Sequence, residues 1–136
     1  MDGVILTPLK QIHHPKGDIL HAMKASDVGF DGFGEAYFST ISKGEIKGWK
    51  KHTKMTLNLV VPVGKIEFVI YDGSEFFSVK LSKKNYQRLT VKPNLWLAFK
   101  GLSNENVLLN LANMEHVTAE SENTALHNIN YDWNRL

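Results

Sequence analysis

The stretch of sequence that decides the fold and the site reads Gly44-Glu45-Ile46-Lys47-Gly48-Trp49-Lys50-Lys51-His52-Thr53-Lys54-Met55. It gathers lysines and a histidine immediately before the longest strand-like run of the chain. In an extended segment, successive side chains point to opposite faces. The alternation predicts a polar face of Lys50, His52, Lys54, Thr56 and Asn58, and an apolar face of Met55, Leu57, Leu59 and Val61. Such a polar face either meets bulk water or lines a wet pocket, where histidine beside amines suits an anionic ligand.

The whole chain has the length and composition of one soluble globular domain. Its 136 residues are 43% hydrophobic and 22% charged, so we expect a single domain over residues 1–136. No apolar run is long enough to span a bilayer and no secretory signal is visible at the N-terminus, which predicts a cytoplasmic protein without a membrane partner. Cysteine is absent, which excludes disulfides, thiolate nucleophiles and cysteine-ligated zinc.

The distribution of charge argues against nucleic acid as a partner. The formal net charge is only +2, and a nucleic-acid-binding domain usually carries a strongly basic, arginine-rich stripe. The cations here are local and nearly all lysine. Five of them lie close together: Lys43, Lys47, Lys50, Lys51 and Lys54. This clustering favours a small site for phosphate groups.

Short strand-like runs recur along the chain about every ten residues, separated by turn residues. The runs are Val4-Ile5-Leu6, Ile19-Leu20, Glu35 to Ile41, the central strand up to Pro62, Lys65 to Tyr71, Phe77 to Leu81, Leu89 to Val91, Leu95 to Phe99 and Val107 to Leu111. The turn at Val63-Gly64 predicts that the central strand and the next run form a hairpin. No segment has the pattern of a long amphipathic helix, so the sequence predicts an all-β sandwich, jelly roll or small barrel. Tyr131 and Trp133 in an otherwise polar tail predict that the C-terminus docks on the body.

Two motifs resemble a known family. The run Ser42 to Lys50 followed by Val63-Gly64-Lys65-Ile66 resembles the RmlC-like cupin family of dTDP-4-dehydrorhamnose 3,5-epimerases and related sugar-nucleotide 3,4-ketoisomerases. The resemblance extends over nearly the whole chain. It implies a cupin double-stranded β-helix (jelly roll) and a homodimer. It also implies a cofactor-free isomerase or epimerase acting on a 4-keto-6-deoxy nucleoside-diphosphate sugar, in surface polysaccharide biosynthesis.

The resemblance also implies site residues. In the epimerases a Lys-Gly-x-x-Arg-Gly-x-His pattern carries the catalytic base, and Lys50 stands here where that histidine belongs. His52 corresponds to the second histidine of the ketoisomerases. His116 lies where the family places the tyrosine that acts as general acid. These are the expected catalytic residues: His52, Lys50 and His116. Lys16 resembles a basic residue that reaches the diphosphate across a dimer interface, and Glu35 resembles a nucleotide contact. The expected substrate-binding residues are Lys16, Glu35, Lys47, Lys54 and Asn58.

The chemistry implied needs a base beside a ketone, an acid for the enolate and cations for the diphosphate. A histidine exchanges protons near neutral pH without special tuning, which favours His52 as the proton carrier. Metal-dependent cupins use a His-x-His pair, a glutamate and a further histidine, and this chain lacks that set, so we expect no metal. The alternative function is a barrel that binds carbohydrate or nucleotide sugar without chemistry, because both proton-transfer positions of the epimerases are changed. A purely structural interpretation of the same residues is also open, in which the lysines form a solvated face and His116 is a surface or packing histidine.

Overall fold

The computed structural model describes residues 1–134 and is built almost entirely of β-strands. The strands are β1 (Val4–Pro8), β2 (Gln11–Ile12), β3 (Ile19–Leu20), β4 (Glu35–Thr40), β5 (Ile46–His52), β6 (Leu57–Val63), β7 (Ile66–Tyr71), β8 (Phe76–Leu81), β9 (Gln87–Val91), β10 (Trp96–Gly101), β11 (Val107–Ala112) and β12 (Ser121–Asn123). Two short 3-10 helices, η1 (Thr118–Glu120) and η2 (Leu126–Asn128), flank β12. The predicted all-β jelly roll is confirmed.

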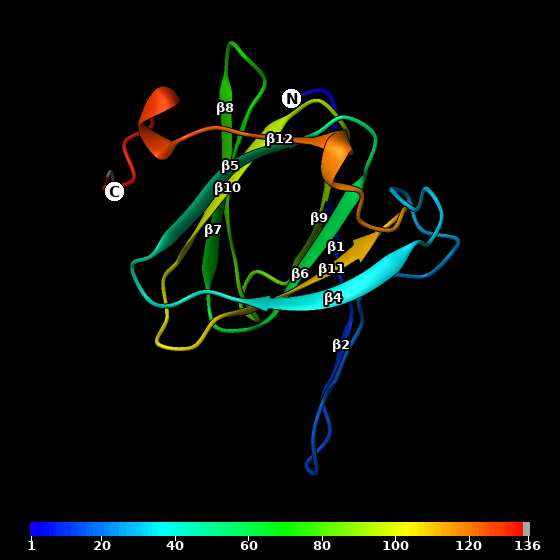
Figure 1. Ribbon diagram of the computed structural model, residues 1–136. Helices are drawn as coiled ribbons and strands as arrows, with labels where there is room; N and C mark the ends of the chain where they lie inside the picture. The colour runs from blue at the N-terminus through cyan, green and yellow to red at the C-terminus, as the bar shows by residue number, and fades with distance from the viewer. Residues whose placement is uncertain (135–136) are drawn as a thin grey trace.

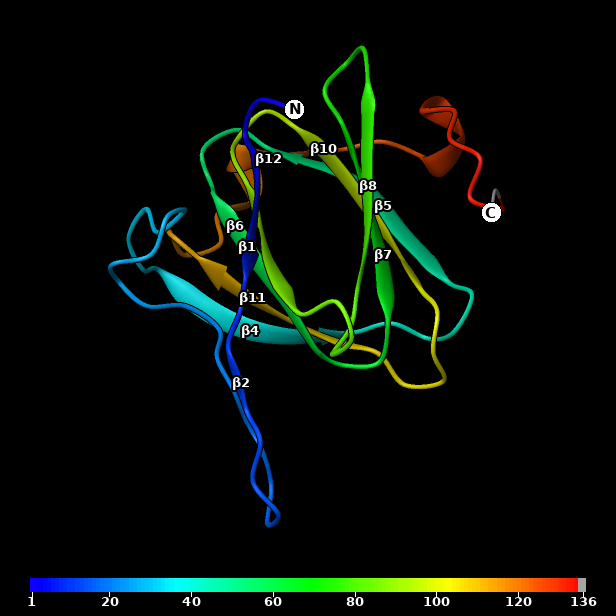
Figure 2. The same cartoon turned by 180° about the vertical axis from the view of Figure 1, so that it is seen from behind.

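Two five-stranded antiparallel sheets face each other (Figure 1). The first has the strand order β1-β9-β6-β11-β4 and the second β12-β5-β10-β7-β8. In the view from behind (Figure 2), β1, β9 and β6 of the first sheet lie on one side of the molecule. β7 and β8 of the second sheet lie on the opposite side. Because β4 and the β12–β5 pair lie at edges of their sheets, the space between the sheets opens where these edges face each other.

The core fills the space between the sheets. Residues 66–70 of β7 are all buried, and Phe68 of this strand packs in one cluster with Leu59, Leu89 and Leu108 from the first sheet. Burying each such side chain stabilises the fold by roughly 1.5–3 kcal/mol. Because β7 is buried on both faces, its apolar residues 68–70 are consecutive and do not alternate with exposed polar residues.

The predicted hairpin of the central strand with the next run is wrong. β6 pairs with β9 and β11 in the first sheet, whereas β7 pairs with β10 and β8 in the second. The turn between them crosses from one sheet to the other. Gly64 has φ 81° there, and a Cβ atom at this position would overlap the Glu105 backbone, so glycine is required for the crossing.

The single central strand predicted from the sequence is also wrong, because the chain turns between β5 and β6. The carboxylate of Glu120 accepts the backbone N–H groups of Lys54 and Met55 over 3.1 and 3.2 Å, which prevents these groups from joining a sheet ladder. The predicted polar face therefore ends at His52. Asn58, in β6, points to the outer side of the first sheet, where it binds Gly29 and Thr90.

A two-stranded hairpin of β2 and β3 projects away from the body in both ribbon views. Val4–Pro8, which contains the first predicted run, forms an edge strand of the first sheet, but Ile19–Leu20 pairs with Gln11–Ile12 in this hairpin and joins neither large sheet. The C-terminal segment docks on the second sheet as predicted, where Tyr131 and Trp133 pack on Trp49. Among residues 1–134, no helix has the length and apolar character that crossing a membrane requires.

Candidate active site

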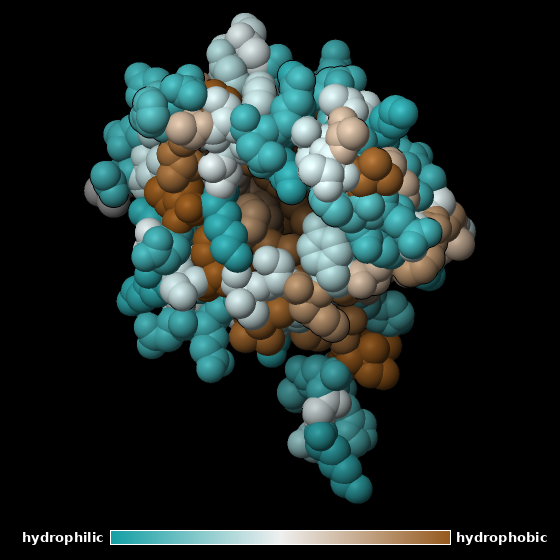
Figure 3. Space-filling view, in the orientation of Figure 1, coloured by the Kyte–Doolittle hydropathy of each residue, from teal (hydrophilic) through white to brown (hydrophobic). Residues whose placement is uncertain are grey.

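A cavity of about 300 Å³ lies between the two sheets, at the opening between β4 and β5. Figure 3 shows this face hollowed near its centre, with hydrophobic residues at the bottom and hydrophilic residues around the rim. The floor is apolar: Leu57, Leu59, Leu97, Phe99 and Leu108. The polar part of the wall consists of Tyr37, Ser39, Lys47, Lys50, His52, Asn110 and Asn123. An apolar cavity with a few converging polar groups is the usual form of a small-molecule site.

His52, the last residue of β5, is held by a carboxylate from the C-terminal segment. Its Nδ1 atom is hydrogen-bonded to Oε1 of Glu120, and the two side chains are 10% and 3% exposed. A carboxylate on Nδ1 fixes the tautomer in which that nitrogen carries the proton. The other ring nitrogen, Nε2, then holds a free electron pair on the cavity side. A histidine held in this way is prepared to remove a proton from a ligand.

Glu120 is kept ionised by its neighbours. Burial acts to raise the pKa of this carboxyl group, but hydrogen bonds from His52 and from the N–H groups of Lys54 and Met55 outweigh it and lower the pKa below 4.5. The same residue is anchored through its backbone, because the carbonyl of Glu120 accepts the N–H of Thr53 over 2.8 Å and the Thr53 hydroxyl over 2.6 Å. The carboxylate is therefore a fixed negative charge beside His52.

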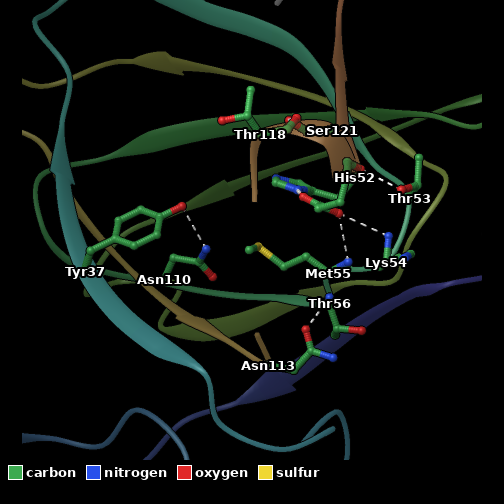
Figure 4. Close-up of polar contacts among 11 residues, drawn as sticks. Tyr37, His52, Thr53, Lys54, Met55, Thr56, Asn110, Asn113, Thr118 and Ser121 are labelled. Atoms are coloured by element: carbon green, nitrogen blue, oxygen red, sulfur yellow. Dashed lines mark hydrogen bonds and ion pairs between the residues drawn. The ribbon is translucent and has the colours of Figure 1, made fainter. Parts of the chain in front are cut away.

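Tyr37 lies across the cavity from His52. In Figure 4 its ring comes from β4, and its hydroxyl points toward the space in front of His52. Asn110 of β11, directly paired with Tyr37 in the sheet register, donates a hydrogen bond from Nδ2 to this hydroxyl over 3.0 Å. The site thus has an ionisable nitrogen on one wall and a positioned hydroxyl on the other.

Two lysines add positive charge to the wall. Lys50 precedes His52 by two residues on the inward face of β5, and its ammonium group has no hydrogen bond or ion pair within residues 1–134. Lys47 is more exposed and donates from Nζ to the carbonyl of Thr40 over 2.7 Å. No carboxylate lines the cavity in the described part of the chain. The electrostatics therefore favour an anionic ligand or an oxyanion.

The structure brings three of the expected site residues together and leaves five elsewhere. His52, Lys50 and Lys47 line the cavity. His116 is exposed in the loop between β11 and η1, and Lys54 is exposed in the turn after β5. Glu35 is the first residue of β4 and Lys16 lies in the turn of the projecting hairpin, both outside the cavity lining. Asn58 is 2% exposed and faces away from the cavity.

Five polar residues of the site were missed by the sequence reasoning: Tyr37, Ser39, Asn110, Glu120 and Asn123. Tyr37 and Ser39 alternate along β4, so period two in that strand could have placed them on one face. Glu120 and Asn123 come from a tail that looks polar and irregular, and nothing local in the sequence distinguishes them. Within residues 1–134, no three His, Asp or Glu side chains approach each other closely enough to hold a metal ion.

The chain is similar to a defined protein family. Residues 2–125 match the family described as FdtA: WxcM-like, C-terminal. No curated protein matches the chain. A solved dTDP sugar isomerase from Desulfovibrio desulfuricans is 31% identical, with a TM-score of 0.92 over 97% of this chain and 91% of that one.

Two more distant structures share the fold. QdtA, a sugar 3,4-ketoisomerase from Thermoanaerobacterium thermosaccharolyticum solved with TDP, is 21% identical, with a TM-score of 0.80 over 90% of this chain and 88% of that one. NovW, a 4-keto-6-deoxy sugar epimerase from Streptomyces spheroides, is 17% identical, with a TM-score of 0.81 over 92% of this chain and 70% of that one. At these identities the likeness concerns the fold alone.

Proposed function

Because the chain belongs to the FdtA, WxcM-like C-terminal family, we propose that it is an isomerase of a 4-keto-6-deoxy sugar carried on dTDP or another nucleoside diphosphate. The observation that carries the proposal is the pairing of His52 with Glu120 on one wall of the cavity, with Tyr37 on the other. This arrangement supplies a base and a proton donor on opposite walls of the cavity. As expected from the sequence, the proposed reaction uses no cofactor.

The reaction begins with enolisation. Nε2 of His52 removes the proton from the ring carbon beside the ketone, and the electron pair of that C–H bond moves toward the carbonyl oxygen. Tyr37 donates a hydrogen bond or its proton to that oxygen, and the ammonium group of Lys50 stabilises the negative charge that develops there. Glu120 stabilises the imidazolium form of His52. The resulting enediol collapses when a proton returns to carbon.

The carbon that receives the returning proton decides the product. If the enediol loses the proton of its other hydroxyl group and gains one at the former ketone carbon, the ketone moves by one position. One base on one face of the ring is sufficient for this transfer, and His52 is the only histidine that lines the cavity among the described residues. We therefore propose 3,4-ketoisomerisation as the reaction. The 31% identical neighbour carries the description of a dTDP sugar isomerase, which supports an isomerase reaction of either kind.

Epimerisation is the second candidate, and the position of Tyr37 favours it. Inverting a carbon requires proton removal on one face and proton delivery on the other, and Tyr37 lies on the wall opposite His52. Both reactions share the enolisation step, so both require the same base.

Incubation with dTDP-4-keto-6-deoxyglucose in deuterated water separates these possibilities. A ketoisomerase places deuterium at the former ketone carbon and gives the 3-keto sugar. An epimerase places deuterium at an inverted carbon and retains the 4-ketone. If the protein binds the nucleotide sugar without any exchange at carbon, the proposal is wrong and the non-catalytic carbohydrate- or nucleotide-sugar-binding alternative holds.

We also propose that the protein acts as a homodimer, with the whole chain as one cupin domain. Phe38, on the outer face of edge strand β4, is 70% exposed, and its neighbours Leu109 and Leu111 on β11 are only half-buried. An apolar sheet face of this kind, beside the projecting hairpin, supports pairing of two copies. Leu57, Leu59 and Val61, which belong to the apolar face predicted from the sequence, point inward and form part of the core, so they are not available for this contact.

The family resemblance supports a role for the projecting hairpin in the dimer. Lys16 lies in the turn of this hairpin and is not part of the lining of its own cavity, so we propose that it contacts the diphosphate bound by the other copy. The cytoplasmic location and a place in surface polysaccharide biosynthesis stay predictions.

A further inference from the structure

The segment of residues 118–133, here called the strap, supplies two groups of the site: one supports His52 and the other lines the cavity. Its β12 is the edge strand of the second sheet, and its end packs on Trp49. Glu120 holds His52, and Asn123 forms part of the cavity wall. The strap reaches the site through β12, which crosses the upper edge of the opening in Figure 1. β12 has three residues and a single neighbour, β5. So short an edge strand gives little stability of its own.

The pairing of β12 with β5 sets the register of the site. Ser121 lies opposite His52, and Asn123 lies opposite Lys50. A shift of one residue along this pairing would turn the strap side chains to the opposite faces of the sheet. The cavity geometry therefore depends on contacts that prevent such a shift.

Those contacts come from the outward-facing residues of β5. Trp49 and Thr124 exchange two backbone hydrogen bonds of 3.2 and 3.1 Å. The indole nitrogen of Trp49 donates to the carbonyl of Leu126 over 3.3 Å. Lys51 adds an ion pair of 3.0 Å to Glu122. The strap is thus fixed from the face of β5 that points away from the ligand.

Trp49 is buried because the strap covers it. It is 1% exposed, although it lies outside the core between the sheets. Its ring centre is 6.1 Å from that of Trp133, and Trp133 in turn meets the ring of Tyr131 edge-on at 5.0 Å. The end of the strap is also tied to β10, because Lys100 donates from Nζ to the carbonyl of Trp133 over 3.4 Å.

Strand β5 therefore has two roles, one on each face. Lys50 and His52 point to the cavity, while Trp49 and Lys51 hold the strap that returns Glu120 to His52. We infer that Trp49 is a positioning residue, which fixes the strap in the register that places Glu120 against Nδ1 of His52. This inference rests on the proposed function only for the identity of the substrate, because its effect on His52 can be measured in the resting protein.

The test compares Trp49→Phe with Tyr86→Phe. The first variant keeps an aromatic ring and loses the hydrogen bond to Leu126. The second loses an equivalent bond, from the Tyr86 hydroxyl to the carbonyl of His21 over 2.8 Å, in a region far from the strap. Nitrogen-15 NMR of the His52 ring reports which nitrogen carries the proton, and isotope exchange with the keto sugar reports turnover.

For Trp49→Phe we expect loss of the single Nδ1–H form of His52 and a fall in kcat of about tenfold, with KM changed less than twofold. Tyr86→Phe should leave the His52 signal and the turnover unchanged. Trp133→Ala removes only the outer ring of the cluster and should change the His52 signal in the same direction, which keeps the test informative if Trp49→Phe is unstable.

If both tryptophan variants retain the Nδ1–H signal of the unmodified protein, the inference is overturned. A second outcome is that the tryptophan variants change the His52 NMR signal, but neither they nor the unmodified protein exchanges protons with a keto sugar. In that case the positioning role holds and the proposed function fails. The two failures are therefore distinguishable.

Discussion

Asn110 donates a hydrogen bond from its side-chain nitrogen to the hydroxyl oxygen of Tyr37 over 3.0 Å. The orientation of the Asn110 amide is fixed, because its Oδ1 accepts the backbone N–H of Asn58 over 3.2 Å. The Tyr37 oxygen is therefore the acceptor in this pair, and its proton remains available for a ligand in the cavity. The buried Asn110 amide thus leaves the Tyr37 hydroxyl as a hydrogen-bond donor toward the cavity.

Tyr37→Phe should reduce turnover by about a hundredfold, because general acid catalysis and an oxyanion hydrogen bond each contribute on this scale. Binding of dTDP should change little. Kinetics under saturating keto sugar measure the effect. The control is Tyr71→Phe, which removes an exposed hydroxyl bonded to Gly73 over 2.9 Å and should be silent. Full activity of Tyr37→Phe would remove Tyr37 from the mechanism.

His52→Asn should abolish exchange at the sugar carbon, with a loss of about 10²- to 10⁴-fold, because no other histidine lines the cavity within residues 1–134. Affinity for dTDP should be nearly unchanged, which calorimetry can verify. His116→Asn is the matched variant, and its exposed position predicts normal exchange. If His52→Asn kept normal exchange and His116→Asn lost it, His116 would be the base.

Lys50→Met should weaken both binding and turnover, because a charge-assisted contact to phosphate or an enolate oxygen stabilises by roughly 1.5–3 kcal/mol. This corresponds to a loss of about 10- to 150-fold. Lys84→Met, at an exposed position in the turn between β8 and β9, changes the net charge equally and should affect neither quantity more than twofold. Equal effects of the two substitutions would mean that only the overall charge matters.

Glu120→Gln should alter how the free energy of unfolding depends on pH. The lowered pKa of Glu120 means that its ionised form stabilises the fold fully above its ordinary value of 4.5, and that this contribution is lost as the pH falls below it. The stability difference between the unmodified protein and the variant should therefore be largest near pH 7 and shrink toward pH 3. Urea unfolding at several pH values measures it. Glu122→Gln, at an exposed position, is the control, and a difference independent of pH would contradict the assignment.

Phe38→Asp should convert the proposed dimer to a monomer, because it places a charge in the apolar outer face of β4. Light scattering should then change from about twice the chain mass to 15.4 kDa. Phe33→Asp is a comparison at another exposed phenylalanine, just outside the strand. A 15.4 kDa species for the unmodified protein at micromolar concentration would contradict the dimer itself.

Local sequence pattern was sufficient for most of the strands and for three of the seven polar residues of the cavity wall. Alternation placed Lys50 and His52 on one face of β5, because neighbouring residues of a strand point to opposite sides whatever the rest of the fold does. The same rule would have placed Tyr37 and Ser39 together. It failed beyond His52, because two backbone N–H groups there bind Glu120 rather than a neighbouring strand.

What the sequence by itself determined is an all-β chain of short strands with a cationic, histidine-bearing strand at its centre, since these properties depend on period two and on turn residues close in the sequence. Only the tertiary structure decided that β6 and β7 belong to different sheets, that Tyr37 faces His52, and that Glu120 is the partner of His52 from 68 residues away. These relationships depend on strand order and on the docking of the tail at Trp49. Contacts between distant segments are set by which apolar faces bury one another, and no local pattern encodes that choice.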